Sequence, residues 1–252
     1  MANTCSPPSD QIISSLHESP GEITADCTAF YSLMFPYTLC PSAMYTAVLR
    51  INAIRGKASA SMRTCGKLNA DHIPEADNLL KRIIAFLPEE WAQQDGFYEE
   101  WLLVGAMYHM AVALYCILSL QSLAILPNTA EMNTMRSQFG DRLLHTLRKS
   151  VEKSRIAKFS TWPLVVAGVE SAYRGEGSRN WVEAALGDLS RSLGTSSMLK
   201  ARAVLRRYWQ RGKPGWDECF DCPYVFRLRA SGSRTVLIAP GKQYCRRMLR
   251  AR

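Results

Sequence analysis

Apolar residues recur at intervals of three and four along most of this chain, and this spacing places them on one face of an α-helix. A first series follows Pro41, where we predict a helix that stops at Gly56. A second series follows Pro74 and consists of Leu79, Leu80, Ile83, Ile84 and Leu87. A third begins at Asn128 and consists of Met132, Met135, Phe139, Leu143, Leu147 and Val151. No strand-like alternation occurs before Tyr224, so we predict an all-α fold, an irregular multi-helix bundle.

Capping and helix-stopping residues predict three further helices in the second half of the chain. They run from Trp162 to about Gly175, from Trp181 to Leu193, and from Met198 to Gln210. Pro163 suits a first helical turn, because the backbone N–H that proline lacks has no partner within the helix at that position. Asn180 and Glu183 have the spacing of a capping box, and Gly194 stands where a C-terminal glycine is expected.

The stretch from Trp101 to Leu126 contains no Asp, Glu, Lys or Arg over 26 residues. Its length alone is enough to cross a bilayer. However, Tyr108, Tyr115 and Ser119 fall at helical spacing as a polar stripe, and no excess of basic residues flanks either end. We therefore predict a long, buried central helix, and a single membrane span is the weaker alternative.

Charge and composition divide the chain into three parts. Residues 1–24 are rich in Ser, Pro and Thr, which predicts a mobile lead-in. Residues 25–226 form the predicted helical domain, and residues 227–252 form a basic tail. This tail contains eight Arg or Lys and no acidic residue, so it leaves only +1 of the net charge of +9 to the rest of the chain. The body therefore carries no general signal for nucleic-acid binding.

Two explanations of the basic tail remain open. Its arginines, including Arg227, Arg229, Arg246 and Arg247, are typical of a nuclear-import or phosphate-binding segment. The same composition would also result from extra coding sequence after an altered splice or reading frame. At the other end, residues 1–14 have no basic region leading into an apolar core, so we expect no secretory signal and an intracellular protein with reduced thiols.

Few residues have a pattern that indicates chemistry. Among the eight cysteines only Cys219 and Cys222 form a C-x-x-C pair, and the acidic residues around them favour a raised thiol pKa. We interpret this pair as structural or incidental. The four histidines have no spacing that would place two metal ligands on one helix face. The chain also lacks a glycine-rich phosphate loop and a nucleophile elbow, so we expect neither an enzyme nor a bound cofactor or metal.

A small apolar ligand is the one candidate for a bound molecule. His109 lies in the apolar stretch, where its ring could act as a base or orient a ligand. Tyr108 and Trp162 could line the same pocket. The competing interpretation is that all three are core residues, since aromatic residues at helical spacing and hydrogen-bonded histidines are common in protein interiors.

Several segments also resemble a known family. They are Trp101 to Gln121, Trp162 to Glu170, Arg207 to Phe220 and Pro223 to Phe226. In this order they resemble the second type of fungal-specific transcription factor domain, the regulatory domain of zinc-cluster transcription factors. The resemblance covers roughly residues 70–226. It implies an all-helical regulatory region, a nuclear location and control of RNA polymerase II transcription, often of metabolic or secondary-metabolite genes, and it implies no catalytic residues.

One feature of these transcription factors does not occur in this sequence. Their DNA-binding module contains six cysteines in a compact run, and the cysteines here are scattered. We therefore expect a transcription-regulator-like protein that acts through other regulators, a homodimer partner or a small apolar ligand, without sequence-specific DNA binding. The alternative is a helical small-molecule-binding protein or enzyme of a secondary-metabolite pathway, built from the same domain.

Overall fold

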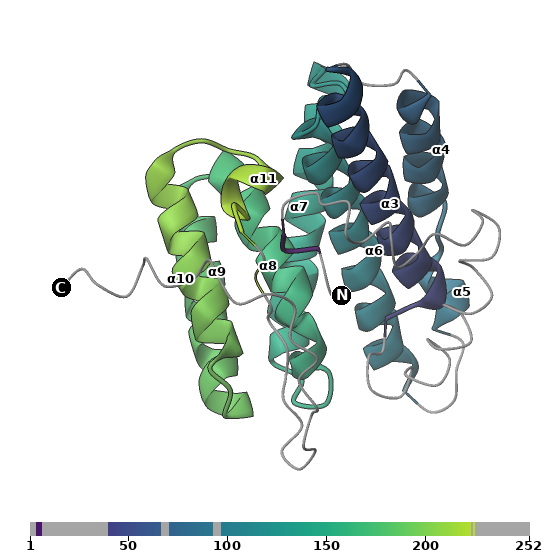
Figure 1. Ribbon diagram of the computed structural model, residues 1–252. Helices are drawn as coiled ribbons and strands as arrows, with labels where there is room; N and C mark the ends of the chain where they lie inside the picture. The colour runs from purple at the N-terminus through teal and green to yellow at the C-terminus, as the bar shows by residue number, and fades with distance from the viewer. Residues whose placement is uncertain (1–3, 7–39, 67–70, 93–96, 223, 225–252) are drawn as a thin grey trace, which may run out of the picture.

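The computed structural model describes residues 4–6, 40–66, 71–92, 97–222 and 224 (Figure 1). Within these ranges the regular elements are α-helices, numbered α3 to α11, and two short 3-10 helices. The predicted all-α fold is confirmed. The basic tail and most of the predicted lead-in lie outside the described residues.

The first half of the chain forms a group of helices around α6. The elements are α3 (Ser42–Cys65), α4 (His72–Ile84), α5 (Pro88–Trp91), α6 (Tyr98–Gln121) and α7 (Ala130–Val151). α3, α4 and α5 pack against α6, and α7 packs along another side of it (Figure 1). Thr129 caps the N-terminus of α7, because its hydroxyl oxygen accepts a hydrogen bond from the Met132 N–H at 3.2 Å.

The second half adds a smaller group that meets the first along α8. The elements are η1 (Ala157–Ser160), α8 (Thr161–Glu170), η2 (Ser171–Tyr173), α9 (Glu176–Leu193), α10 (Ser197–Arg211) and α11 (Trp216–Cys219). α9 and α10 pack against each other, and α8 lies between this pair and the α6–α7 pair (Figure 1). All ten residues of α8 are buried. α8 is therefore the element that joins the two groups.

α6 is the centre of the core. It is long and apolar enough to cross a membrane by length and composition, but 83% of its most apolar 18-residue window is buried within the protein. α3, α4, α5, α7, α8 and α11 all contact it. The predicted long, buried central helix is confirmed, and burial on all sides explains why its sequence lacks a charged face.

The predicted stop at Gly56 is wrong. α3 continues through Gly56, which is buried, and ends before Gly66, whose φ of 66° is left-handed. A glycine inside a helix costs about 1 kcal/mol relative to alanine. Burial of neighbours such as Ile51, Ile54 and Ala58 offsets this cost.

Two predicted boundaries in the second half are also wrong. α8 ends at Glu170, before the glycines that were expected to stop it. α9 begins at Glu176, so Asn180 lies inside the helix and does not cap it. In contrast, Gly194 ends α9 as predicted, with a φ of 61° that side chains rarely adopt.

A close approach between α8 and α10 depends on Gly168. A Cβ atom at this position would lie 2.4 Å from Cδ1 of Leu205. No side chain can be accommodated at that distance without displacement of α10 or of the leucine. Gly168 therefore allows α10 to pack directly on the α8 backbone.

Residues 4–6 lie inside the protein, between α8 and α3 (dark purple in Figure 1). The exposed fractions of Thr4, Cys5 and Ser6 are 0%, 5% and 8%. At these three positions the structure departs from the mobile lead-in expected for residues 1–24. The physical reason is that side chains from three distant elements donate hydrogen bonds to this segment.

Candidate functional site

The segment Thr4–Ser6 occupies a slot formed by Arg55, Trp162, Trp216 and Tyr224, which we call the Thr4–Ser6 slot. Trp162 Nε1 donates to the Thr4 hydroxyl at 2.9 Å, and Trp216 Nε1 donates to the Thr4 carbonyl at 2.8 Å. The backbone N–H of Tyr224 donates to the Cys5 carbonyl at 2.8 Å. Arg55 Nη2 lies 3.5 Å from the Ser6 carbonyl. In each of these contacts the slot supplies the donor and the segment supplies the acceptor.

Local structure fixes the position of Trp216. Gly215 has a φ of 155° and turns the chain into α11, of which Trp216 is the first residue. The N–H of Gly215 donates to the Tyr208 hydroxyl at 3.0 Å, and the N–H of Trp216 donates to Ser122 Oγ at 2.9 Å. The start of α11 is thus tied to α10 and to the end of α6.

Aromatic contacts hold both indole rings in place. The Tyr115 ring lies edge-on to Trp216, with centroids 4.7 Å apart, and edge-on to Trp162 at 6.0 Å. Tyr108 stacks on Trp162 at 6.2 Å with an angle of 11° between the rings. These arrangements are the favoured geometries for aromatic pairs. They orient the two indole N–H groups toward residue 4.

A buried polar network lies beneath the slot. Arg55 donates to the Tyr115 hydroxyl at 3.2 Å and forms an ion pair with Asp217. The Tyr115 hydroxyl in turn donates to Asn52 Oδ1. Burial raises the pKa of Tyr115 to about 12, so its hydroxyl stays protonated at neutral pH. Because Asp217 balances the buried Arg55, the network is compatible with an uncharged occupant.

The predicted ligand-binding residues are only partly brought together. Tyr108 and Trp162 stack on each other, and the Tyr108 hydroxyl donates to the Phe159 carbonyl at 3.2 Å. His109 lies on a different side of α6, where its ring contacts Phe86 and Phe139 edge-on at 5.7 and 6.0 Å. The ring contacts therefore place His109 apart from the Tyr108–Trp162 pair. A ligand-binding role for each residue stays a prediction.

The surroundings of His109 are those of a core histidine. Burial lowers its pKa, the charge of Arg142 lowers it further, and a hydrogen bond with the Ile83 backbone partly opposes both. The ring is therefore neutral at physiological pH. Its Nε2 atom has no hydrogen-bond partner among the residues that the structure describes.

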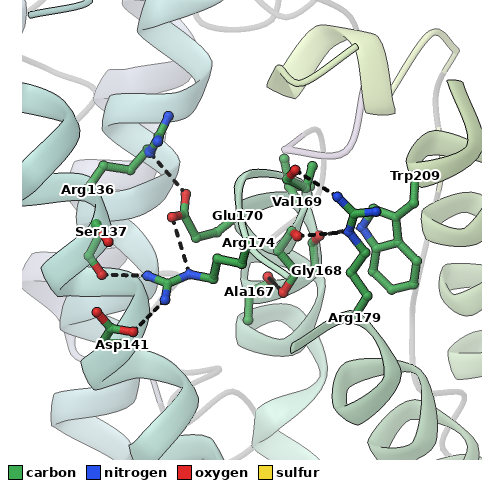
Figure 2. A network of polar contacts seen from close by, with 12 residues as sticks. Arg136, Ser137, Asp141, Ala167, Gly168, Val169, Glu170, Arg174, Arg179 and Trp209 are labelled. Carbon is green, nitrogen blue, oxygen red and sulfur yellow. Dashed lines mark hydrogen bonds and ion pairs between the residues drawn. The ribbon is translucent and has the colours of Figure 1, made fainter. Parts of the chain in front are cut away.

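A second buried polar network lies at the other end of α8 (Figure 2). The side chain of Glu170 is 2% exposed, and its two oxygens lie 3.3 Å from Arg136 Nε and 3.5 Å from Arg174 Nε. Arg174 also pairs with Asp141 on α7. Burial raises the pKa of Glu170 to about 7, although the two arginines act in the opposite direction. We call Arg136, Asp141, Glu170 and Arg174 the Glu170 network.

Side chains from α9 and α10 bind carbonyl groups at the C-terminal end of α8 and in η2, which follows it directly. Arg179 donates to the carbonyls of Ser171 and Ala172 at 3.1 and 3.0 Å. Trp209 Nε1 donates to the Gly168 carbonyl at 2.9 Å (Figure 2). A helix leaves its last carbonyls without partners, and these donors satisfy them. Both ends of α8 are therefore held by polar groups from other elements.

The remaining candidates from the sequence have ordinary surroundings. Cys219 is 2% exposed, and burial raises its thiol pKa well above the usual range. No group of three or more potential metal ligands occurs in the described part of the chain. Arg206 pairs with Glu183. The tail residues Arg227, Arg229, Arg246 and Arg247 lie outside the described residues.

The segments that resemble the fungal-specific transcription factor domain follow one another along this helical fold in the family's order. They define the class of the protein as a regulatory domain of a transcription regulator. The sequence matches the fungal specific transcription factor domain over residues 36–233, which is most of the chain. The protein belongs to this family. The resemblance predicted for residues 70–226 is confirmed, and it begins earlier in the chain than predicted. No solved structure matches this protein.

A curated relative has a specific description. The chain is 38% identical over 196 residues to a "phomenoic acid biosynthesis cluster-specific transcriptional regulator" of Leptosphaeria maculans. The match covers 77% of this chain and 37% of the relative. This chain therefore corresponds to little more than a third of the relative's length.

The Thr4–Ser6 slot and the Glu170 network were both missed at the sequence level. Glu170 and Arg174 are four residues apart, a spacing that indicates an ion pair on a helix. This signal was available. In contrast, Trp162 and Thr4 are 158 positions apart, and nothing in the Ser- and Pro-rich segment indicated a buried contact.

Proposed function

We propose that this domain regulates the transcription of secondary-metabolite biosynthetic genes in a fungal nucleus. We further propose that it acts through contacts with other regulators, with a second copy or with a small molecule. The match to the fungal specific transcription factor domain carries this proposal. The relative, which is described as specific for a biosynthesis cluster, supports the gene class.

The electrostatics of the described residues favour contacts with proteins over direct reading of DNA. Sequence-specific DNA binding requires side chains that reach base edges, in addition to contacts with phosphates. Several arginines of the body are already engaged with carboxylates: Arg55 with Asp217, Arg136 with Glu170, and Arg206 with Glu183. We therefore expect this chain to bind DNA without sequence preference, and only at low salt.

Gene replacement in a fungal host that carries this gene tests the proposal. The gene is deleted, and the strain is complemented with the wild-type sequence, with Ala113→Arg or with Ala184→Arg. Ala113 is fully buried in α6, so an arginine there should unfold the domain. Ala184 lies on the exposed side of α9 and receives the same substitution as a matched control.

The readout is RNA sequencing together with the location of a fluorescent fusion. We expect deletion to change the transcripts of a set of clustered biosynthetic genes, and we expect wild type and Ala184→Arg, but not Ala113→Arg, to restore them. Unchanged transcripts together with a changed metabolite profile would instead support the alternative, a small-molecule-binding protein or enzyme of the pathway.

A further inference from the structure

We propose that the Thr4–Ser6 slot is a binding site for a short, bent peptide that carries a Ser or Thr hydroxyl, and that residues 4–6 are an exchangeable occupant of this site. A matching segment of a partner protein would compete for the same contacts. This inference goes beyond the proposed function, because it concerns peptide binding whether or not the domain controls transcription.

The slot recognises the backbone of its occupant. Three consecutive carbonyl groups, those of residues 4, 5 and 6, face Trp216 Nε1, the Tyr224 N–H and Arg55 Nη2. Every peptide presents such carbonyls, so these contacts hold a short, bent segment without reading its sequence. The slot is therefore suited to a peptide rather than to a compact ligand.

Specificity comes from the remaining contact. Trp162 Nε1 donates to the Thr4 hydroxyl at 2.9 Å, and a side chain without an oxygen would leave this buried N–H unpaired. The exposed fraction of Thr4 is 0%, so a large side chain does not fit. Together, these features select Ser or Thr at the first position of the occupant.

Exchange is feasible because the occupant is short. Only three residues fill the slot, and 33 residues of sequence separate Ser6 from Cys40, the next described position. A segment of the same chain competes at a finite effective concentration, which is about millimolar where the connection is flexible. A partner segment that binds tightly, or that is itself held close to the domain, can therefore displace residues 4–6.

The first experiment measures binding of a peptide of residues 2–10, with Cys5→Ser and a fluorescent label at its C-terminus, to the full chain by anisotropy. The Thr4→Arg variant of the chain cannot place its own segment in the enclosed slot. We expect this variant to bind the peptide at least tenfold more tightly than the wild-type chain does. Circular dichroism checks that the variant keeps its helical content. Equal binding by the two chains would overturn the proposal.

A change in the peptide tests which contact carries specificity. A peptide with Thr4→Val has nearly the same shape but no hydroxyl, and we expect it to bind Thr4→Arg about five- to tenfold more weakly. Trp162→Phe, made in the Thr4→Arg chain, removes the N–H and should abolish this preference. Trp209→Phe is the matched control, because the Trp209 indole donates its hydrogen bond to the Gly168 carbonyl and not to the slot. This variant should keep the preference for the peptide with Thr4. Equal binding of both peptides to the Thr4→Arg chain would contradict the proposed recognition.

A second readout uses the wild-type chain and needs no label. Burial raises the pKa of the Cys5 thiol to about 12, so alkylation by N-ethylmaleimide should be slow. Excess Cys5→Ser peptide should displace residues 4–6 and speed alkylation of Cys5 at least fivefold, as measured by mass spectrometry. Cys116, which is fully buried in α6, should not respond. An unchanged Cys5 rate at saturating peptide would show that the segment does not exchange.

Discussion

Glu170 should make the folded protein less stable as the pH rises from about 4.5 to about 7. Its carboxyl group has an ordinary pKa of 4.5, and burial raises this pKa to about 7 in the folded state. Arg136 and Arg174 stabilise the charged form, but they offset only part of the cost of removing the carboxylate from water. The folded and unfolded chains therefore hold this proton with different strength.

The sign and size of the effect follow from proton linkage. Between these two pKa values the folded chain keeps the proton and the unfolded chain has released it, so unfolding releases a proton and becomes easier as the pH rises. A pKa difference of this size corresponds to about 3 kcal/mol. The stability that protonated Glu170 gives to the folded chain is fully present below about pH 4.5 and is lost above about pH 7.

The assay is urea unfolding of wild type and Glu170→Gln, followed by circular dichroism, at several pH values between 4.5 and 8. Glutamine has a similar shape and does not titrate. The difference in unfolding free energy between the two proteins should therefore shift by about 3 kcal/mol over this range, against wild type at high pH. His109, whose lowered pKa has the opposite effect on stability, is present in both proteins and cancels.

Glu152→Gln is the matched control, since it makes the same chemical change at an exposed position. The unfolding free energy of Glu152→Gln, relative to wild type, should not change with pH in the way expected for Glu170→Gln. If the difference in unfolding free energy between wild type and Glu170→Gln is independent of pH, the reasoning is refuted. A difference that favours wild type more as the pH rises would show that Arg136 and Arg174 outweigh burial, and that the Glu170 network is a net stabilising ion pair.

Three further predictions concern packing and the tail. Ala113→Arg should lower the unfolding free energy by about 3 kcal/mol or more, because it buries an unpaired charge. Ala184→Arg should change the unfolding free energy by less than about 0.5 kcal/mol. Equal effects of the two substitutions in urea titrations would contradict the central position of α6. Gly168→Ala should cost about 1–3 kcal/mol, because its Cβ would lie 2.4 Å from Leu205 Cδ1; thermal unfolding measures this cost, and Leu205→Ala should reduce it. Deletion of residues 227–252 should leave the helical content almost unchanged and reduce nuclear accumulation of a fluorescent fusion, whereas loss of the circular-dichroism signal would mean that the tail is part of the fold.

The helices were predictable wherever a local pattern was enough. Apolar spacing identified α4 and α7, capping and helix-stopping residues identified α10, and the absence of charge identified α6 as a helix buried on all sides. Gly56 shows where this reasoning fails. A glycine is a valid stop signal in an isolated helix, but the packing of α3 against α4 and α6 outweighs it. A local sequence pattern does not predict packing between distant segments.

The site was less predictable than the fold, because it is made of long-range contacts. Tyr108 and Trp162 were selected for their aromatic character, and they do meet. His109 was selected because it lies in the apolar stretch, but neighbouring helical residues point about 100° apart. Its ring therefore faces Phe86, which follows α4, and Phe139 of α7. The burial of Thr4 depends on two indoles that are 158 and 212 positions away. Composition alone favoured an exposed segment there.

The two polar sites lie at opposite ends of α8, and this arrangement limits how far an exchange in the Thr4–Ser6 slot can spread. At one end Trp162 contacts the exchangeable segment. At the other end Glu170 is held by two arginines, and Trp209 binds the Gly168 carbonyl (Figure 2). The α9–α10 pair is attached to this second end, so it keeps an anchor that does not involve residues 4–6, although Arg207 and Tyr208 of α10 also contact Tyr224 and Gly215 beside the slot.

Displacement of residues 4–6 should therefore loosen the first turn of α8 and α11, and leave α9 and α10 unchanged. Hydrogen exchange with and without excess peptide measures this difference directly. Faster exchange is expected around Trp162 and Trp216, and not in α9 or α10. Equally faster exchange in α9 and α10 would mean that the Glu170 network does not anchor α8, and that occupancy of the slot is instead coupled to the packing of the whole second group of helices.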